Sequence, residues 1–142
     1  MIIRQQYQDL PNNCVSACLA MISGKSVNEV TAEFHDGYHN RDIDIYEYLD
    51  ALGIRFIKKY PCEKQTLKKG FVYLLAVPSL NIVGGMHEIV VDFSGDDAVI
   101  LDPAPEEKNR YEDFGQSGTG RLCSWIIDAE FHVGELINKR IA

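Results

Sequence analysis

The sequence lacks the marks of several protein classes. Its longest apolar run, residues 71–77, is far too short to cross a bilayer. The first ten residues hold neither an apolar run nor the small-residue cleavage site of a secretory signal. Lys and Arg number 14 against 21 Asp and Glu, a net charge of -7, whereas phosphate contacts need clustered cations. We therefore expect a cytoplasmic protein with no membrane span and no nucleic-acid partner, with signal-independent secretion as an effector left open.

Cysteine is present, but in no metal-binding pattern. The chain has four cysteines and no Cys-x-x-Cys motif. Cys14 and Cys18 are one helical turn apart with no His pair close by in the sequence, so a structural zinc site is not expected. Without a secretory signal, reduced thiols are expected rather than disulfides. The sequence predicts neither a metal nor an organic cofactor.

What the chain does contain is the composition of one globular domain. Hydrophobic residues make up 46% and charged residues 25% of its 142 residues. That is enough apolar surface for one core and too much for a disordered chain. No internal repeat, low-complexity tract or linker divides the sequence. We expect a single domain over residues 1–142.

Start and stop signals predict two helices near the beginning of the chain. Residues 14–22 are an apolar segment with Asn13 as a plausible N-cap and Gly24 as the stop. A capping box that begins at Ser26 predicts a second helix to about residue 34. Both helices precede every predicted strand.

A loop over residues 37–41 separates these helices from a third helix and a set of strands. Asp42 or Asp44 can cap the third helix, which ends at Gly53. The predicted strands cover residues 54–57, 71–77, 87–93, 98–101 and 122–127, with a hairpin turn at 94–97. Helices followed by strands predict an α+β fold, with N-terminal helices packed on an antiparallel sheet.

Cys14 is the candidate nucleophile because it begins a predicted helix. Unsatisfied backbone N–H groups and the positive end of the helix dipole stabilise a thiolate at that place. Cys18 lies deeper in the same apolar segment, and Cys62 and Cys123 have no helix start beside them. The alternative for Cys14 is a small buried helix residue, since free cysteine is among the most buried residue types.

His87 is the candidate base among four histidines. His35 and His39 flank a polar loop, and His132 lies in a polar stretch near the chain end. His87 opens an apolar strand directly after a flexible glycine-rich segment, so a sheet would hold it rigidly while one side stays open. Considered alone, a histidine at this place is more often a surface residue at a strand end.

Asp102 and Gln8 complete the predicted site. The hairpin turn at 94–97 folds the next strand back, which brings His87 and Asp102 to the same end of the hairpin. A carboxylate there can accept the imidazole N–H and fix the tautomer. Gln8 lies six residues before Cys14, where its side-chain amide can donate to an oxyanion together with the backbone N–H of Cys14.

Together these residues resemble a known family. Gln8 stands six residues before Cys14, which opens the segment CVSACLAMI; residues 84–91 read GGMHEIVV and residues 99–103 read VILDP. In order and spacing this is similar to the double-glycine leader peptidases, the N-terminal domains of bacteriocin-exporting ABC transporters and members of the papain-like cysteine peptidases. The resemblance covers roughly residues 3–114. The chain departs from the family pattern around the cleft, at Asn13, Val15, Met86 and Glu88.

The resemblance implies a papain-like fold and a cysteine hydrolase. Cys14 would be the nucleophile, His87 its base, Asp102 the group that orients the base and Gln8 an oxyanion donor. The implied reaction is that of a cysteine peptidase acting on a peptide or protein substrate. The same groups also serve a protein glutamine deamidase or a transglutaminase-type effector, and an inactive binding module is a further alternative.

Overall fold

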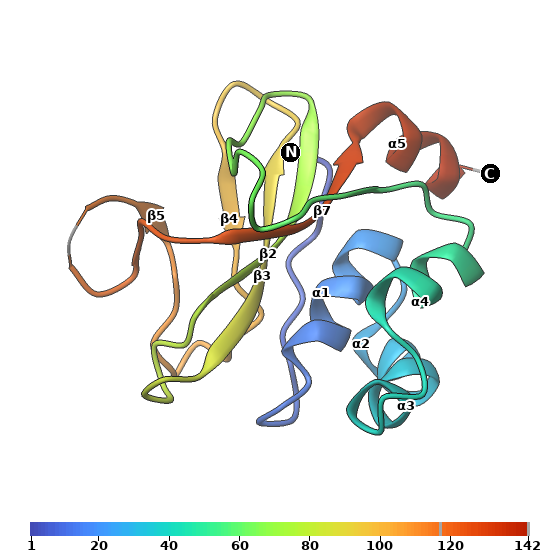
Figure 1. Cartoon of the computed structure of the whole chain (residues 1–142), viewed down its shortest axis with the longest axis horizontal. Helices are drawn as coiled ribbons and strands as arrows, with labels where there is room; N and C mark the ends of the chain where they lie inside the picture. Colours follow the sequence, from blue (N-terminus) through green and yellow to red (C-terminus); the bar gives the residue numbers. More distant parts are fainter. Residues whose placement is uncertain (117, 142) are drawn as a thin grey trace.

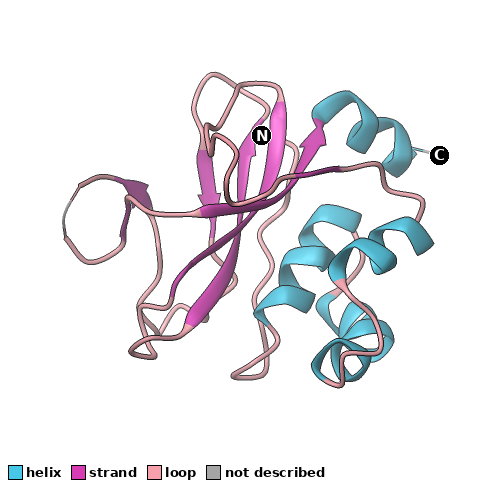
Figure 2. Cartoon of the chain, viewed as in Figure 1, coloured by secondary structure: helices cyan, strands magenta, loops and turns pink. Residues whose placement is uncertain are grey.

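The structure, a computed structural model, describes residues 1–116 and 118–141. The helical elements are α1 (Cys14–Ser23), α2 (Val27–Val30), the π-helical turn η1 (Thr31–His35), α3 (Asp36–His39), α4 (Ile45–Ala51) and α5 (Val133–Ile141). The strands are β1 (Ile57–Lys58), β2 (Phe71–Pro78), β3 (Met86–Phe93), β4 (Val99–Leu101), β5 (Asp113–Phe114), β6 (Arg121–Leu122) and β7 (Ile126–His132). The helices lie together on one side of the sheet (Figures 1 and 2). The predicted α+β class is confirmed.

Helix α1 follows the predicted bounds closely, but its start differs in detail. Residues 16–22 are all buried, and Gly24 ends the helix with a φ of 79°, a left-handed conformation that glycine adopts without strain. Asn13 occupies the N-cap position, yet its side chain does not cap the helix. Its Oδ1 accepts from the Leu10 N–H at 2.9 Å, and its Nδ2 donates to Asp9 Oδ1 at 2.6 Å. The side chain therefore holds the preceding turn rather than the first helical N–H groups.

The capping box predicted at Ser26 is confirmed. Of the two cap candidates for the third helix, Asp44 is the N-cap, and it also forms a capping box with Glu47. The predicted loop over 37–41 is wrong, because η1 and α3 continue the helical path to His39. Packing explains the continuation: the rings of Phe34 and Tyr38 are stacked with centroids 4.9 Å apart, and Phe34 is buried. Apolar contacts of the next turn thus override the polar composition of this segment.

The main sheet has the order β1-β7-β2-β3-β4, and every neighbouring pair in it is antiparallel. The apolar strand β2 lies at its centre, as its composition predicts. The predicted strand over 54–57 is wrong in position: β1 is a short edge strand that begins at Ile57, and Ile54 instead joins the core. The predicted strand over 122–127 is divided between β6 and the longer β7, and β6 pairs with β5 in parallel.

The sheet separates two cores. On the helix side, residues such as Leu74, Val90 and Phe131 pack against the helices. On the other side, Tyr73 and Ile89 are covered by the irregular segments before β2 and after β4. Helix α1 packs on β3, and this contact sets the start of α1 beside the start of β3. Within the described part of the chain, none of the helices combines the length and the apolar character needed to cross a bilayer.

One irregularity interrupts the pairing of β2 with β7. Leu74 pairs with Ala129, but the next residue, Leu75, pairs with Ile127, so Asp128 is an extra residue without a partner in the ladder. Such a β-bulge bends the strand and redirects the side chain of the extra residue. It lies toward the end of the sheet at which β3 begins, since Ala76 pairs with both Glu88 and Ile126.

Candidate active site

The thiol of Cys14 lies at the first residue of α1, where the structure places three hydrogen-bond partners around it. The sulfur is hydrogen-bonded to the His87 side chain and to the backbone N–H groups of Glu88 and Val15. Burial alone would raise the pKa of the thiol, but these bonds and the charge of His87 outweigh burial and lower it. Because Asn13 does not cap the helix, the Val15 N–H is available to the sulfur.

His87 stands at the start of β3, between the thiol and a buried carboxylate. Its Nε2 lies 2.6 Å from Asp102 Oδ1, which leaves Nδ1 for Cys14. Burial alone would lower the pKa of His87, but the hydrogen bonds to Asp102 and Cys14 outweigh it and raise the pKa to about 9. A raised imidazole pKa next to a lowered thiol pKa favours the thiolate–imidazolium pair at neutral pH.

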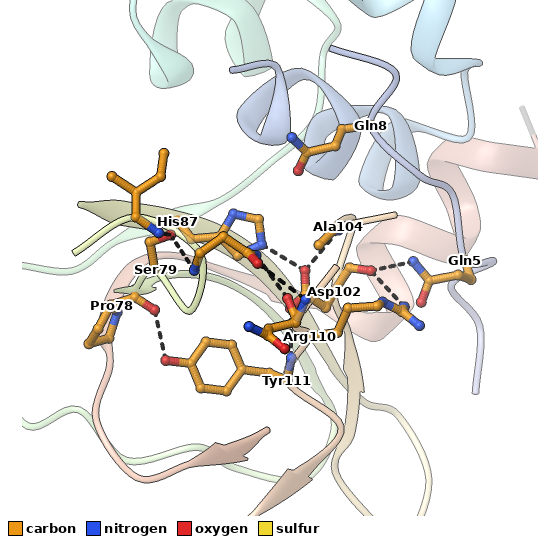
Figure 3. A network of polar contacts seen from close by, with 12 residues as sticks. Gln5, Gln8, Pro78, Ser79, His87, Asp102, Ala104, Arg110 and Tyr111 are labelled. Carbon is orange, nitrogen blue, oxygen red and sulfur yellow. Dashed lines mark hydrogen bonds and ion pairs between the residues drawn. The ribbon is translucent and has the colours of Figure 1, made fainter. Parts of the chain in front are cut away.

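The Asp102 side chain is only 1% exposed and is held by backbone donors (Figure 3). Its Oδ1 accepts from the Ala104 N–H at 2.9 Å as well as from His87, and its Oδ2 accepts from the Tyr111 N–H at 2.8 Å. The β3–β4 ladder ends with Val90 opposite Leu101, so Asp102 follows directly at the end where β3 begins. The hairpin register therefore brings His87 and Asp102 together as the sequence predicts.

The N-terminal segment is attached to the chain around Asp102. Gln5 Nε2 and Arg110 Nη2 donate to the Asp102 backbone carbonyl at 2.8 and 2.9 Å, and the Gln8 N–H donates to the Pro103 carbonyl at 2.8 Å. Figure 3 shows the Gln5 and Arg110 side chains converging on this carbonyl. Sequence reasoning missed both residues, because Gln5 lies far from Asp102 in the chain and Arg110 reaches the carbonyl from an irregular segment, so no local pattern indicates either contact.

Gln8 lies on the α1 side of the site, and Figure 3 shows its amide turned toward His87 and Asp102. Its Nε2 donates to the Leu10 carbonyl at 2.9 Å, while its Oε1 is buried with no partner among the described residues. Donation to an oxyanion requires the amide to rotate by about 180°, which exchanges the two atoms at the cost of the Leu10 bond. The oxyanion role of Gln8 stays a prediction.

The other cysteines and histidines lie outside this arrangement. Cys18 is fully buried, and burial raises the pKa of its thiol well above the ordinary value, whereas Cys62 and Cys123 are exposed. His39 contacts the Asn12 carbonyl and His132 packs on the Phe71 ring. In residues 1–116 and 118–141, no three His, Cys, Asp or Glu side chains are grouped so that they could hold a metal ion.

Comparison with protein-family models, with curated proteins and with solved structures found no match to this chain. Any conclusion about function therefore depends on the geometry of the site itself.

Proposed function

We propose that the protein is a papain-like cysteine hydrolase, and specifically a cysteine peptidase that acts on a peptide or protein. One observation carries the proposal: a continuous hydrogen-bonded chain runs from the Cys14 thiol through His87 to the buried Asp102 carboxylate. This is the arrangement that nucleophilic acyl transfer needs, because the base both activates the thiol and is itself oriented by a third group. The resemblance to the double-glycine leader peptidases supports the same reaction.

The reaction follows from the roles of these groups. The Cys14 thiolate attacks the substrate carbonyl carbon, and the developing oxyanion is stabilised by backbone N–H groups at the start of α1, with Gln8 as the proposed side-chain donor. His87, as imidazolium, gives its proton to the leaving amine, and the acyl group remains on Cys14 as a thioester. His87 then takes a proton from a water molecule while the oxygen of that water attacks the thioester. The acid is released and Cys14 leaves as the thiolate, which restores the thiolate–imidazolium pair.

The first experiment compares the wild-type protein with Cys14→Ala on a library of fluorescence-quenched peptides. We expect turnover in the wild type and none above the uncatalysed rate in the variant, because no other described thiol lies beside a base. Cys62→Ala is the matched control and should retain full turnover, since Cys62 is exposed. Substantial turnover by Cys14→Ala would contradict the proposal.

The intact mass of a treated protein substrate identifies the reaction. A peptidase produces two shorter chains, and a glutamine deamidase adds about one dalton. A transglutaminase releases ammonia and joins the glutamine acyl group to an amine, which produces a cross-link. An inactive binding module is tested separately with iodoacetamide at neutral pH. We expect Cys14 to be alkylated faster than Cys62 and Cys123, since its pKa is lowered. Equal rates at the three thiols would favour the binding module.

A further inference from the structure

Glu88 is a buried acid directly beside the nucleophile, and the proposed reaction does not use its side chain. It follows His87 on β3, and the alternation of side chains along a strand places it on the helix face of the sheet, the face of Val90. The Glu88 backbone N–H donates to the Cys14 sulfur, and Glu88 as a whole is only 6% exposed. Its Oε2 is buried and has no partner among the described residues.

The β-bulge of β7 brings a second carboxylate to Glu88. Asp128, the extra residue of the bulge, is hydrogen-bonded through its side chain to Glu88. Asp128 is half-buried, so the pair extends from the buried Glu88 toward solvent. The bulge turns the Asp128 carboxylate toward Glu88. Two carboxylates so close together destabilise the folded state when both are ionised, because like charges repel each other.

Two tyrosines of the helical layer line the same place. Tyr38 and Tyr46 are half-buried, and burial together with the charges of Glu88 and Asp128 raises the pKa of both phenols. The Tyr46 hydroxyl also donates to the Asp128 carbonyl at 2.9 Å. Aromatic rings next to carboxylates are favourable surroundings for a cation.

Neither acid of the cluster formed by Glu88, Asp128, Tyr38 and Tyr46 is paired with a cation of the described residues. Of the ion pairs in the described residues, none involves Glu88 or Asp128. Lys58 Nζ lies over the Tyr46 ring, 4.4 Å from its centroid, and forms no ion pair with either acid. A buried carboxylate without a cation or a full set of donors is costly. A group brought by a ligand would supply the missing partner.

We propose that Glu88 and Asp128 form a specificity subsite beside Cys14, which takes a basic side chain, Lys or Arg, of the peptide substrate. The ammonium or guanidinium group would donate to the free Glu88 Oε2 and to Asp128, next to the scissile bond. The subsite rests on the proposed function, since it concerns the substrate of that same nucleophile. It makes the enzyme selective for basic peptides.

Burial and the neighbouring Asp128 charge raise the pKa of Glu88 well above its ordinary value. In the free protein the neutral, protonated form of Glu88 is therefore favoured. A bound cation stabilises the ionised form of Glu88, so binding of a basic side chain releases this proton.

The subsite can be tested on the thiol itself, without any turnover. The probes are 2-aminoethyl methanethiosulfonate, which is cationic, and 2-hydroxyethyl methanethiosulfonate, its neutral counterpart. With either probe the thiolate forms a mixed disulfide and a sulfinate leaves. We expect the rate ratio, cationic over neutral, to be about ten-fold higher at Cys14 than at the exposed Cys62 and Cys123, because a negative site concentrates cations. Mass spectrometry of the proteolytic peptides measures how fast each of the three cysteines is modified, so the three rate ratios come from the same protein sample.

The variants Glu88→Gln and Asp128→Asn keep the size of each side chain and remove the carboxylate. Each should lower the ratio at Cys14 toward that of the exposed thiols. Asp97→Asn is the matched control: it removes one charge from an exposed residue in the turn at the far end of β3, and should leave the ratio unchanged. A wild-type ratio at Cys14 equal to that at Cys62 overturns the proposal even if no variant folds. A ratio that survives both substitutions overturns it as well.

A second experiment measures peptide cleavage, and its control is a chemically modified form of the same peptide. A cleaved peptide with Lys next to the scissile bond is compared with the same peptide carrying acetyl-lysine, on wild-type protein. We expect kcat/KM to fall about ten- to hundred-fold on acetylation, and Glu88→Gln to remove most of the difference. Cleavage with equal efficiency for both peptides overturns the subsite and leaves the peptidase intact. Absence of cleavage with a high probe ratio at Cys14 overturns the peptidase and leaves the cation site intact.

Discussion

At the scale of single residues, the donors around Asp102 determine what the site can do. The two carboxylate oxygens accept from His87, Ala104 and Tyr111, so the acid is held in one orientation. An acid fixed in this way fixes the ring of His87 in turn, which directs the other ring nitrogen to Cys14. Asp102 thus acts on the Cys14 thiol indirectly: its position orients the His87 ring, and its charge favours the imidazolium form of that ring.

Asp102→Asn should lower both turnover and the pKa of His87. The amide is neutral, and if its oxygen faces His87 its NH₂ group faces the Tyr111 N–H, so two donors are opposed. We expect the pKa of His87 to fall from about 9 toward its ordinary value, because the carboxylate that favours the imidazolium is gone. NMR titration of the His87 ring measures this shift. An unchanged pKa would contradict the role of Asp102; His39 provides an internal reference.

Gln8→Ala tests the oxyanion prediction. If the Gln8 amide donates to the oxyanion, kcat should fall about 10²–10³-fold with little change in KM, because the bond is made only in the transition state. Gln6→Ala is the control, since Gln6 donates instead to the Lys25 carbonyl, away from the site. A change in KM alone would show that Gln8 binds substrate through its free Oε1.

The residues of the site could be predicted only where local patterns fix their place. Cys14 and Asp102 follow from a helix start and from counting outward from a hairpin turn. Gln5 and Arg110 could not, because both contact the Asp102 backbone carbonyl, from 97 residues away for Gln5 and through an irregular segment for Arg110, and neither contact has a local pattern. Asn13 was expected to cap α1 and instead binds Leu10 and Asp9, a choice between two local hydrogen-bonding patterns that composition does not decide.

At the scale of elements, one side chain of β3 holds the N-terminal segment that carries Gln8. Asp92 is 1% exposed, and its Oδ2 accepts from the Ile2 and Ile3 N–H groups, each at 2.7 Å. Its Oδ1 accepts from the Ser94 N–H at 2.9 Å. The same strand thus anchors the segment at one end and presents His87 at the other.

Asp92→Ala should destabilise the protein and loosen this segment. It leaves the buried Ile3 N–H without its acceptor and also removes the Asp92 bonds to Ile2 and Ser94, which we expect to cost about 2–4 kcal/mol of the free energy of unfolding. Urea denaturation measures the loss, with Asp97→Asn as a surface control that should change stability by less than about 0.5 kcal/mol. Equal midpoints for the two variants would show that the anchor contributes nothing.

Elements with strong local signals were predicted well, and those without such signals were not. Ser26 and Asp44 begin helices because their capping boxes satisfy backbone donors locally. Helix α5 was not predicted: it lacks a clear start signal, and Leu136 is buried by packing on elements distant in sequence. The bounds of β7 were missed for a similar reason, since the bulge at Asp128 breaks the alternation that marks a strand.

At the scale of the whole molecule, the Cys14–His87 pair couples stability to pH. His87 has a raised pKa, so its contribution is complete below about pH 6.5 and is lost as the pH rises through about 9. Cys14 has a lowered pKa, so its contribution is present at high pH and is lost as the pH falls through the folded value. Where the two ranges overlap, the opposite slopes cancel.

The free energy of unfolding of the wild type should therefore change little with pH over the range in which both slopes act, above about pH 6.5 and above the lowered Cys14 pKa, up to about pH 9. In Cys14→Ala the opposing thiol slope is gone and the His87 slope remains over a narrower pH range, because Cys14 itself contributes to the raised His87 pKa. Over that range stability should decrease with rising pH by up to about 1.4 kcal/mol per pH unit. Urea denaturation at several pH values checks both curves, and Cys62→Ala should follow the wild type. Parallel curves for wild type and Cys14→Ala would show that the thiolate–imidazolium pair does not form.

The arrangement of the site also determines when the thiol becomes reactive during synthesis. Cys14 lies near the beginning of the chain, whereas His87 and the Glu88 N–H come more than seventy residues later. Until β3 has been made and has packed on α1, the thiol has no base and one fewer N–H donor, so it behaves as an ordinary cysteine. A nascent or truncated chain that ends before Asp102 thus exposes no activated nucleophile, and reactivity arises only together with the folded sheet.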